Sequence, residues 1–466
     1  MKLSVVASSP APSQATRRAH LGVSLAAGIA AASLGAGVAR ADDGIPPAPP
    51  AMDTSSAVNP VSMVTGAGVT VGEGTVLHPQ VGIETGVISN VFYQPNGPVM
   101  AGLLRILAEI GTSSLPSQRL TLGATAVGGQ DPSAAQMSGT ASGDFKYSAD
   151  LYASWDQYLS TNDNVNAQGG LGGGLLLRGI VNPEHPLQFS FQEHFNRVIR
   201  ATNFESQADT NRDVNTLSLR LNYVPYGRSI NAYLYYQNLI DVFEASSQQF
   251  ANRLHNTLGL RVNWQWLPLT QVFVDVSGGF NTGLGSSEKV NSLPVTATAG
   301  IQTALTLNTT LNAYAGYTNG FYASGPSYSA LAAGVMFGYR YSPLGRITGL
   351  YSYEHQDSIN ANFYRDHVVQ ATLEHLFVPF LVFARPELRL RRYEGTLIMG
   401  TTGNTRDDTI YSATVGMRYA FRDWIAGTLD YELQSVQTDF RYQVDGLVLD
   451  PSYVRHELMV GVRAAY

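Results

Sequence analysis

Hydrophobic and polar residues alternate along most of this chain with the two-residue period of a β-strand. In residues 216–223 (TLSLRLNY) the leucines and the tyrosine share one face, while the threonine, serine, arginine and asparagine share the other. Residues 254–266 and 381–393 repeat this alternation over stretches longer than the roughly 5–6 residues of an ordinary globular strand. The pattern recurs about every 20 residues from Val76 onwards and predicts a long series of half-apolar strands.

The connections between these strands alternate in length. Short connections fall at residues 224–229, 267–270, 342–346, 378–380 and 421–424. Longer polar connections fall at residues 201–213, 281–294, 395–408 and 435–451. Hydrocarbon cannot satisfy backbone N–H and C=O groups, so strands cross a membrane only when their sheet closes on itself. The sequence therefore predicts an all-β fold, a transmembrane antiparallel up-and-down β-barrel with short periplasmic turns and long extracellular loops.

The number of strands follows from how one stretch is divided. There are 19 candidate strands, but a single-chain barrel with both termini in the periplasm needs an even number. Treating residues 102–126 as one irregular strand gives about 18 strands and puts every long loop on the outside. Barrels of 16 or 20 strands remain alternatives.

Aromatic residues flank the short connections, as expected of a girdle at a membrane interface. The residues of this predicted periplasmic girdle are Tyr223, Trp264, Trp266, Tyr339, Tyr341, Tyr419, Phe421 and Trp424.

The N-terminal region has the features of a secretory signal. Arg17 and Arg18 precede an apolar stretch, residues 21–39, and Ala39-Arg40-Ala41 is an A-x-A-like cleavage site. We expect residues 1–41 to be a signal peptide cleaved after Ala41. Residues 42–75, rich in Pro, Ala and Ser, are expected to be a flexible periplasmic linker, and residues 76–466 the barrel. A twin-arginine signal and a retained membrane anchor are alternatives, and the small-residue cleavage site argues against the anchor.

Composition narrows the class of protein. Charged residues make up 14% of the chain, below the roughly 25% of soluble proteins. Without residues 1–41, which hold four basic residues and no acidic one, 25 basic and 35 acidic residues leave a net charge of −10. That charge argues against nucleic-acid binding. After residue 41 no stretch reaches the ~20 apolar residues of a membrane helix. An exported chain without such a helix or any cysteine fits a barrel in the outer membrane of a Gram-negative cell.

A stretch near the start of the predicted barrel resembles a known family. Residues 77–95 (LHPQVGIETGVISNVFYQP) carry an early Pro79, alternating small and apolar residues, and then Asn90 to Tyr93. In these features, and in residues 150–160 and 174–195, the chain is similar to the beta-barrel porin 2 family. The family's usual Asp-Asn pair is Ser89-Asn90 here. The resemblance implies an outer-membrane barrel that takes part in exopolysaccharide export with a periplasmic export protein, or a porin, and it implies no catalytic residue.

Motifs for chemistry are weak. The glycine-rich residues 169–177 lack a lysine and a following helix pattern, so a packed strand is favoured over a nucleotide loop. None of the nine histidines shows zinc-site spacing. Ser352, Glu354 and His355 lie together near a strand end, but adjacent strand residues face opposite sides. We therefore expect no enzyme, no metal and no cofactor.

The inward-facing rows hold the candidate functional residues. The predicted pore-lining residues are Arg220, Arg261, Arg340, Arg385, Glu387, Arg389, Arg391, Arg418, Asp430, Glu432, Glu457, Arg463, Tyr233 and Tyr235. These charges either form cross-strand ion pairs in a hydrated wall or provide a selectivity surface for a polar or anionic solute, and both hold together. The tyrosines either pack the wall or stack on sugar rings.

Three functions follow from this pattern. We expect a conduit that translocates exopolysaccharide, working with a periplasmic polysaccharide export protein. The first alternative is a diffusion porin for small polar or anionic solutes, and the second is a plugged surface-binding or structural barrel. In residues 458–466 one row is apolar and ends on Tyr466, which we expect to be the signal read by the barrel assembly machinery before insertion into outer-membrane lipid.

Overall fold

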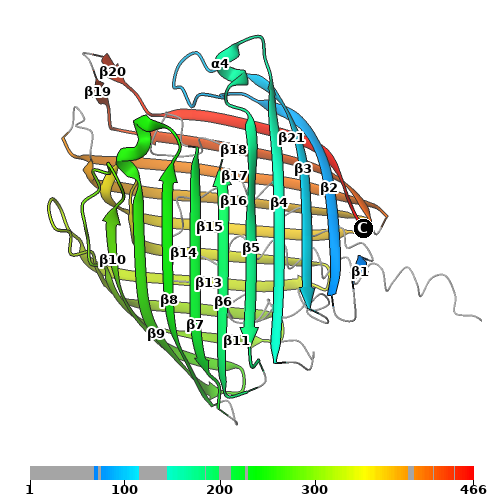
Figure 1. Ribbon diagram of the computed structural model, residues 1–466, viewed down its shortest axis with the longest axis vertical. Coiled ribbons are helices and arrows are strands. Elements are labelled where there is room, and N and C mark those ends of the chain that lie inside the picture. Colours follow the sequence, from blue (N-terminus) through cyan, green and yellow to red (C-terminus); the bar gives the residue numbers. More distant parts are fainter. Residues whose placement is uncertain are drawn as a thin grey trace, which may run out of the picture.

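Eighteen antiparallel strands form a closed β-barrel in the part of the chain that the structure describes (Figure 1). The structure, a computed structural model, describes residues 68–71, 75–114, 144–183, 185–198, 211–225, 229–396, 403–422, 424–444 and 447–466. The barrel strands are β2 (Thr75–Ile88), β3 (Ala101–Ser114), β4 (Phe145–Leu159), β5 (Gly170–Val181), β6 (Leu187–Val198), β7 (Arg212–Tyr223), β8 (Ile230–Phe243), β9 (Arg253–Leu267), β10 (Thr270–Gly283), β11 (Val295–Thr306), β12 (Thr309–Asn319), β13 (Ser329–Ser342), β14 (Gly345–Asp357), β15 (Ala361–Phe377), β16 (Phe380–Thr396), β17 (Thr405–Arg422), β18 (Ile425–Thr438) and β21 (Tyr453–Ala465). The predicted fold and the preferred strand number are confirmed.

Small elements decorate the ends of the barrel. The helix α4 (Asp163–Asn166), the 3₁₀ helix η3 (Ser246–Ala251) and the hairpin β19 (Tyr442–Val444) with β20 (Leu447–Leu449) lie in connections between barrel strands. None of the helices in the described ranges is long and apolar enough to cross a membrane. The strand β1 (Val69–Val71) pairs with the start of β2.

The end of the predicted linker needs correction. Residues 69–71 form a paired strand, and β2 begins at Thr75, so the ordered part starts inside the expected range 42–75. At this point the edge of β2 presents backbone N–H and C=O groups, and the short apolar segment VTV, residues 69–71, pairs with them as an extra strand. The predicted signal peptide and the cleavage site after Ala41 lie outside the described residues.

The barrel closes between its first and last strands. Each strand pairs with its neighbours in the chain, and β2 also pairs with β21 from Gln80 opposite Ala465 to Ile88 opposite Glu457. Beyond this register, the backbone N–H of Tyr466 donates to the carbonyl of Pro79 at 3.0 Å. The wall therefore presents no open edge, which is the condition for placing a sheet in hydrocarbon.

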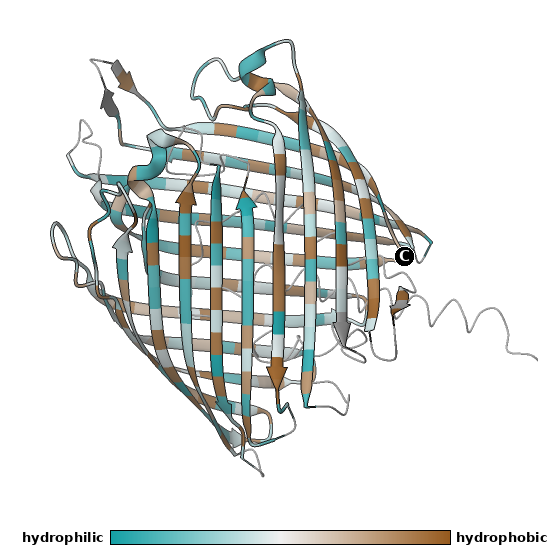
Figure 2. Ribbon diagram, in the orientation of Figure 1, coloured by the Kyte–Doolittle hydropathy of each residue, from teal (hydrophilic) through white to brown (hydrophobic). Residues whose placement is uncertain are grey.

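Hydrophobic and hydrophilic residues alternate along the barrel strands, as the bands of Figure 2 show, and side-chain exposure places the apolar rows outside and the polar rows inside. On β2 the side chains of Val81, Ile83 and Val87 are exposed, whereas Glu84 on the other face is buried. The girdle prediction holds for position: Trp264 and Trp266 are about half exposed next to a short turn, and the other predicted girdle residues also lie on the outer row. An exposed belt of this kind is stable against lipid rather than water.

Long and short connections segregate with two exceptions, which are the β3–β4 connection and the three-residue β14–β15 connection, residues 358–360. The short connections join strand ends at one end of the barrel, as predicted, and residues 199–211, 284–294 and 439–452 join ends at the other. However, Ser114 and Phe145 also lie at the short-turn end by strand parity. The expectation that every long connection lies at the outer end is therefore wrong for the β3–β4 connection. The remainder of the strand expected over 102–126, beyond Ser114, lies outside the described residues.

A row of ion pairs crosses the seam on the inner face. Arg463 of β21 donates from Nε to Glu84 Oε1 of β2 at 2.9 Å. Arg105 of β3 lies 3.8 Å from Glu84 and binds Asp156 of β4 at 2.8 Å. All four side chains are almost fully buried. Ion pairs thus join the first and last strands of the barrel in addition to the backbone hydrogen bonds.

Glu84→Gln is expected to destabilise the closed barrel, because it leaves two buried arginines without their shared carboxylate. Removing one partner of a buried ion pair costs about 3 kcal/mol. The measurement is the temperature at which the folded band converts to the unfolded band on a cold SDS gel. Val81→Leu, on the outer face of the same strand, is the control, and equal midpoints for both variants would contradict the role of the pair.

Candidate functional site

The inner rows of the barrel hold the charged residues that alternation predicts there. All fourteen predicted pore-lining positions lie on the inner rows, and Arg340 is the most exposed of the charged ones because it adjoins a short turn. Arg391 and Arg463 are among the most deeply buried side chains described. Their part in a conducting pore stays a prediction.

On one side of the barrel, positive and negative charges balance. The described inner rows of β14–β18 and β21 carry eight arginines, which are Arg346, Arg385, Arg389, Arg391, Arg406, Arg418, Arg455 and Arg463. They carry eight carboxylates, which are Glu354, Asp366, Glu374, Glu387, Asp408, Asp430, Glu432 and Glu457. Many of them pair directly, as Arg391 with Asp366 at 2.6 Å and Arg418 with Asp430 at 2.7 Å. The structural reading of these charges, a wall stabilised by ion pairs, therefore holds on this side.

On another side, the charges do not balance. The inner rows of β5–β9, all within the described residues, carry five arginines and one carboxylate. The arginines are Arg178, Arg212, Arg220, Arg253 and Arg261, and the carboxylate is Asp241. We call this part of the wall the basic wall. The inner rows of the adjacent strands β2–β4 carry four carboxylates and two basic residues, so the sign of the excess charge changes between these two parts of the wall.

Aromatic rings and amides hold the middle of the basic wall. The guanidinium of Arg220 lies 5.1 Å from the ring centre of Tyr233, and that of Arg261 lies 3.8 Å from Phe273. Arg178 donates to the amide oxygen of Gln192 at 3.2 Å. Stacking on a ring orients a guanidinium without cancelling its charge. These contacts fix the three guanidinium groups in place, and Asp275 of β10, directly opposite Arg261, faces the edge of the basic wall.

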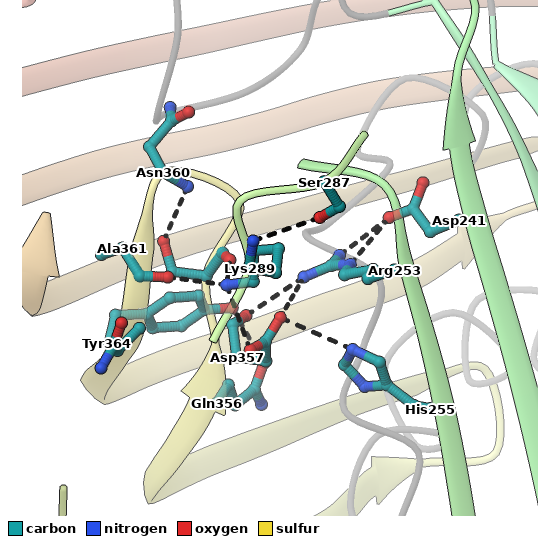
Figure 3. A network of polar contacts seen from close by, with 12 residues as sticks. Asp241, Arg253, His255, Ser287, Lys289, Gln356, Asp357, Asn360, Ala361 and Tyr364 are labelled. Atoms are coloured by element: carbon teal, nitrogen blue, oxygen red, sulfur yellow. Dashed lines mark hydrogen bonds and ion pairs between the residues drawn. The ribbon is translucent and has the colours of Figure 1, made fainter. Parts of the chain in front are cut away.

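The outer mouth of the barrel is crossed by a charged contact (Figure 3). Asp357 at the end of β14 accepts a hydrogen bond from Arg253 of β9 at 2.9 Å, although four strands separate β9 from β14 round the wall. Arg253 also binds Asp241 of β8 at 2.8 Å. His255 Nε2 lies 3.5 Å from Asp357. The tip of the β14–β15 hairpin therefore lies across the mouth, against the inner face of β8 and β9.

A loop secures this crossing. Lys289, in the β10–β11 connection, lies 3.2 Å from Asp357 and donates to the carbonyl of Ala361 at 2.7 Å and to that of Ser358. Beneath it, Ile359 packs with Phe243 and the η3 helix. We call Asp357, the hairpin tip 358–361 and loop 284–294 the mouth bridge. Its polar and apolar contacts pin two loops to opposite parts of the wall.

The neighbouring β12–β13 loop supports the mouth bridge from the side. Tyr322 donates from its hydroxyl to the carbonyl of Asn362 at 2.9 Å, and its backbone bridges to Ser292. Burial, followed by the nearby Asp357 carboxylate, raises the pKa of Tyr322 well above its ordinary value. The hydroxyl therefore remains a donor at any ordinary pH.

A second connection folds inward on the far side of the mouth. Tyr93, between β2 and β3, is almost fully buried and packs edge-on against Tyr453 of β21, with ring centres 5.0 Å apart. Its cluster includes Ile410 and Val436 from the inner rows of β17 and β18. Asn90 fixes the loop by donating to the carbonyls of Gln94 and Val454. The mouth is therefore narrowed from two sides.

Sequence reasoning missed the mouth bridge. Residues 281–294 are recognisable as a long polar connection, but nothing local indicates that Lys289 turns inward. The partner Asp357 ends a strand on the same row as His355, which alternation assigns to the outer face. The contact joins residues 253, 289 and 357, which lie far apart in the chain, so no local sequence pattern predicts it.

Comparisons with known proteins give similarity of structure only. No protein-family model and no curated protein matches the chain. Solved structures similar to it include OpdK of Pseudomonas aeruginosa (9% identity, TM-score 0.45), covering 84% of this chain and 99% of that one. They also include OccAB3 of Acinetobacter baumannii (11%, 0.41; 85% and 100%) and the siderophore receptor PirA of P. aeruginosa (8%, 0.38; 84% and 80%). With TM-scores below 0.5, these likenesses carry no part of the functional argument, and the resemblance to the beta-barrel porin 2 family stays a prediction.

Among the described residues, no group of three or more His, Cys, Asp or Glu side chains is arranged to hold a metal ion.

Asp357→Asn is expected to release loop 284–294, because it removes the carboxylate that Lys289, Arg253 and His255 share. Lys289 is 9% exposed, so the folded protein should resist trypsin there, while the variant should be cut after Lys289. Mass spectrometry of the fragments measures the cleavage. The control is Asp450→Asn, which breaks an exposed 3.0 Å pair with Arg441 in another loop. If trypsin spares Lys289 equally in both variants, the carboxylate does not hold the loop.

Proposed function

We propose that this protein is a selective diffusion porin of the outer membrane, passing small polar solutes and preferring anions. The observation that carries the proposal is the basic wall, where five arginines face the lumen with one carboxylate among them. A row of fixed positive charge raises the local concentration of anions and lowers the barrier to their entry. The mechanism is passage through a hydrated lumen without a chemical step, and the proposal includes no enzymatic activity.

The geometry of the mouth supports a small solute rather than a polymer. The mouth bridge joins β8 and β9 to the β14–β15 hairpin, and the connection carrying Tyr93 folds inward opposite to it. A polysaccharide chain would have to thread past both features at once. The expectation of exopolysaccharide export, with a periplasmic export protein as partner, is therefore less well supported than the porin alternative.

The exposed apolar belt supports placement in a lipid bilayer. Side chains such as Leu258, Trp266 and Val460 are about half exposed along the outer face, an arrangement that water would not tolerate over so wide an area. Outer-membrane lipid and the barrel assembly machinery are accordingly proposed as partners, with Tyr466 as the proposed assembly signal.

The double substitution Arg220→Gln and Arg261→Gln is expected to lower the permeability ratio of chloride to potassium. Both side chains lie in the basic wall, and glutamine keeps a polar group of comparable reach without the charge. The measurement is the reversal potential of single channels in planar bilayers under a potassium chloride gradient. Arg392→Gln, which removes a 41% exposed arginine from the outer face of β16, is the control and should leave the ratio unchanged.

The same recordings, together with a strain that lacks the gene, decide between the candidate functions. A folded barrel that passes no current would overturn the porin proposal and favour a plugged barrel. A strain that lacks the gene and loses its surface polysaccharide would favour export. An unchanged permeability ratio in the double variant would refute anion selection by the basic wall while leaving diffusion intact.

A further inference from the structure

Three lumen tyrosines lie flat against the barrel wall in the same way. Each sits opposite a glycine of the next strand: Tyr152 opposite Gly174, Tyr235 opposite Gly259 and Tyr314 opposite Gly334. In each case a Cβ atom added to the glycine would fall well inside van der Waals contact with the tyrosine ring. The ring therefore occupies the space that any larger residue would take.

Each tyrosine then reaches one strand further. The hydroxyl of Tyr152 donates to Asn196 at 2.8 Å, that of Tyr235 donates to Asp275 at 2.9 Å, and that of Tyr314 donates to Glu354. These acceptors lie on β6, β10 and β14, two strands along from their tyrosines on β4, β8 and β12. A ring that rests on the first neighbour and is tethered to the second must lie along the wall rather than point into the lumen.

Two inner phenylalanines also lie over a glycine of the next strand, but they have no hydroxyl group to donate to a second strand. We call such a glycine under an aromatic ring a glycine seat. Phe273 of β10 lies over Gly300 and Phe383 of β16 lies over Gly416. An arginine guanidinium lies over each ring, that of Arg261 at 3.8 Å from the centre of Phe273 and that of Arg418 at 5.1 Å from the centre of Phe383. Five large inner aromatic side chains thus follow one rule. A glycine directly opposite lets the ring pack across the strands, as known for aromatic residues that cover glycines in sheets.

The arrangement has a consequence for the lumen, because a tyrosine extends about as far as a long side chain of the inner rows. We propose that the seats formed by Gly174, Gly259 and Gly334 set the free cross-section of the lumen by keeping these tyrosines against the wall. These glycines are then determinants of size selectivity. This inference rests on the proposed diffusion function and adds to it the residues that limit solute size.

Gly259→Ala and Gly334→Ala test the inference most cleanly. The three atoms nearest to a Cβ at either position belong to the tyrosine side chain, whereas the atom nearest to a Cβ at Gly174 is the backbone carbonyl oxygen of Phe195. The added methyl should lift the ring into the lumen and reduce single-channel conductance. Gly278→Ala and Gly349→Ala, on the outer rows of β10 and β14, are controls for adding a methyl group to a strand glycine, since a Cβ there meets nothing within 4 Å, and both should conduct as the unsubstituted protein does.

A double variant separates lifting of the ring from general damage to the fold. In Gly259→Ala with Tyr235→Ala there is no ring to lift, so conductance should return to at least the unsubstituted level. A misfolded barrel would not recover in this way. Nitration by tetranitromethane, mapped by mass spectrometry, provides a second readout: Tyr235 is 5% exposed and should become reactive in Gly259→Ala.

The outcomes distinguish this inference from the proposed function. If the unsubstituted barrel conducts and Gly259→Ala conducts equally with Tyr235 still protected from nitration, the glycine seats do not set the lumen width and diffusion stands. If the unsubstituted barrel passes no current, the porin proposal fails and this inference fails with it. Lower conductance in both alanine variants, with recovery in the double variant, supports the inference.

Discussion

The rest of the structure depends on one constraint, which is that every backbone N–H and C=O group in the wall must be bonded to a neighbouring strand. Hydrocarbon supplies no substitute partner. The pairing of β2 with β21 gives hydrogen-bond partners to the backbone N–H and C=O groups at the edges of the first and last strands. Closure also fixes the side chains, because a closed register assigns each residue permanently to the lipid face or the lumen face.

That assignment places the buried charged residues of the wall on its inner face. Arg463, Glu84 and Arg105 lie across the seam on the inner face, where their pairing reinforces the backbone ladder at the point where closure is completed. Around β14–β18 the same inner placement yields balanced pairs, but on β5–β9 the arginines outnumber the carboxylates. One structural requirement thus produces a wall of paired charges in one sector and a wall with excess arginines in another.

The sequence predicts the part of this that is local. Alternation over residues such as 216–223 and 254–266 specifies strand, face and connection length, so the barrel and the inner position of Arg220 or Arg261 follow from the chain alone. The partners of those residues do not follow. Tyr235 sits over Gly259 only because β8 and β9 pair in one register, and neither residue signals that register in its own segment.

The mouth bridge is a second feature that local sequence does not predict, because its partners are far apart in the chain. Lys289 is one charged residue in a polar connection, and its environment is formed by Asp357 and the carbonyls of Ser358 and Ala361. A lysine buried against three oxygens is stable because each ammonium proton finds an acceptor. The loop is therefore part of the wall's electrostatic network rather than a cover resting on it.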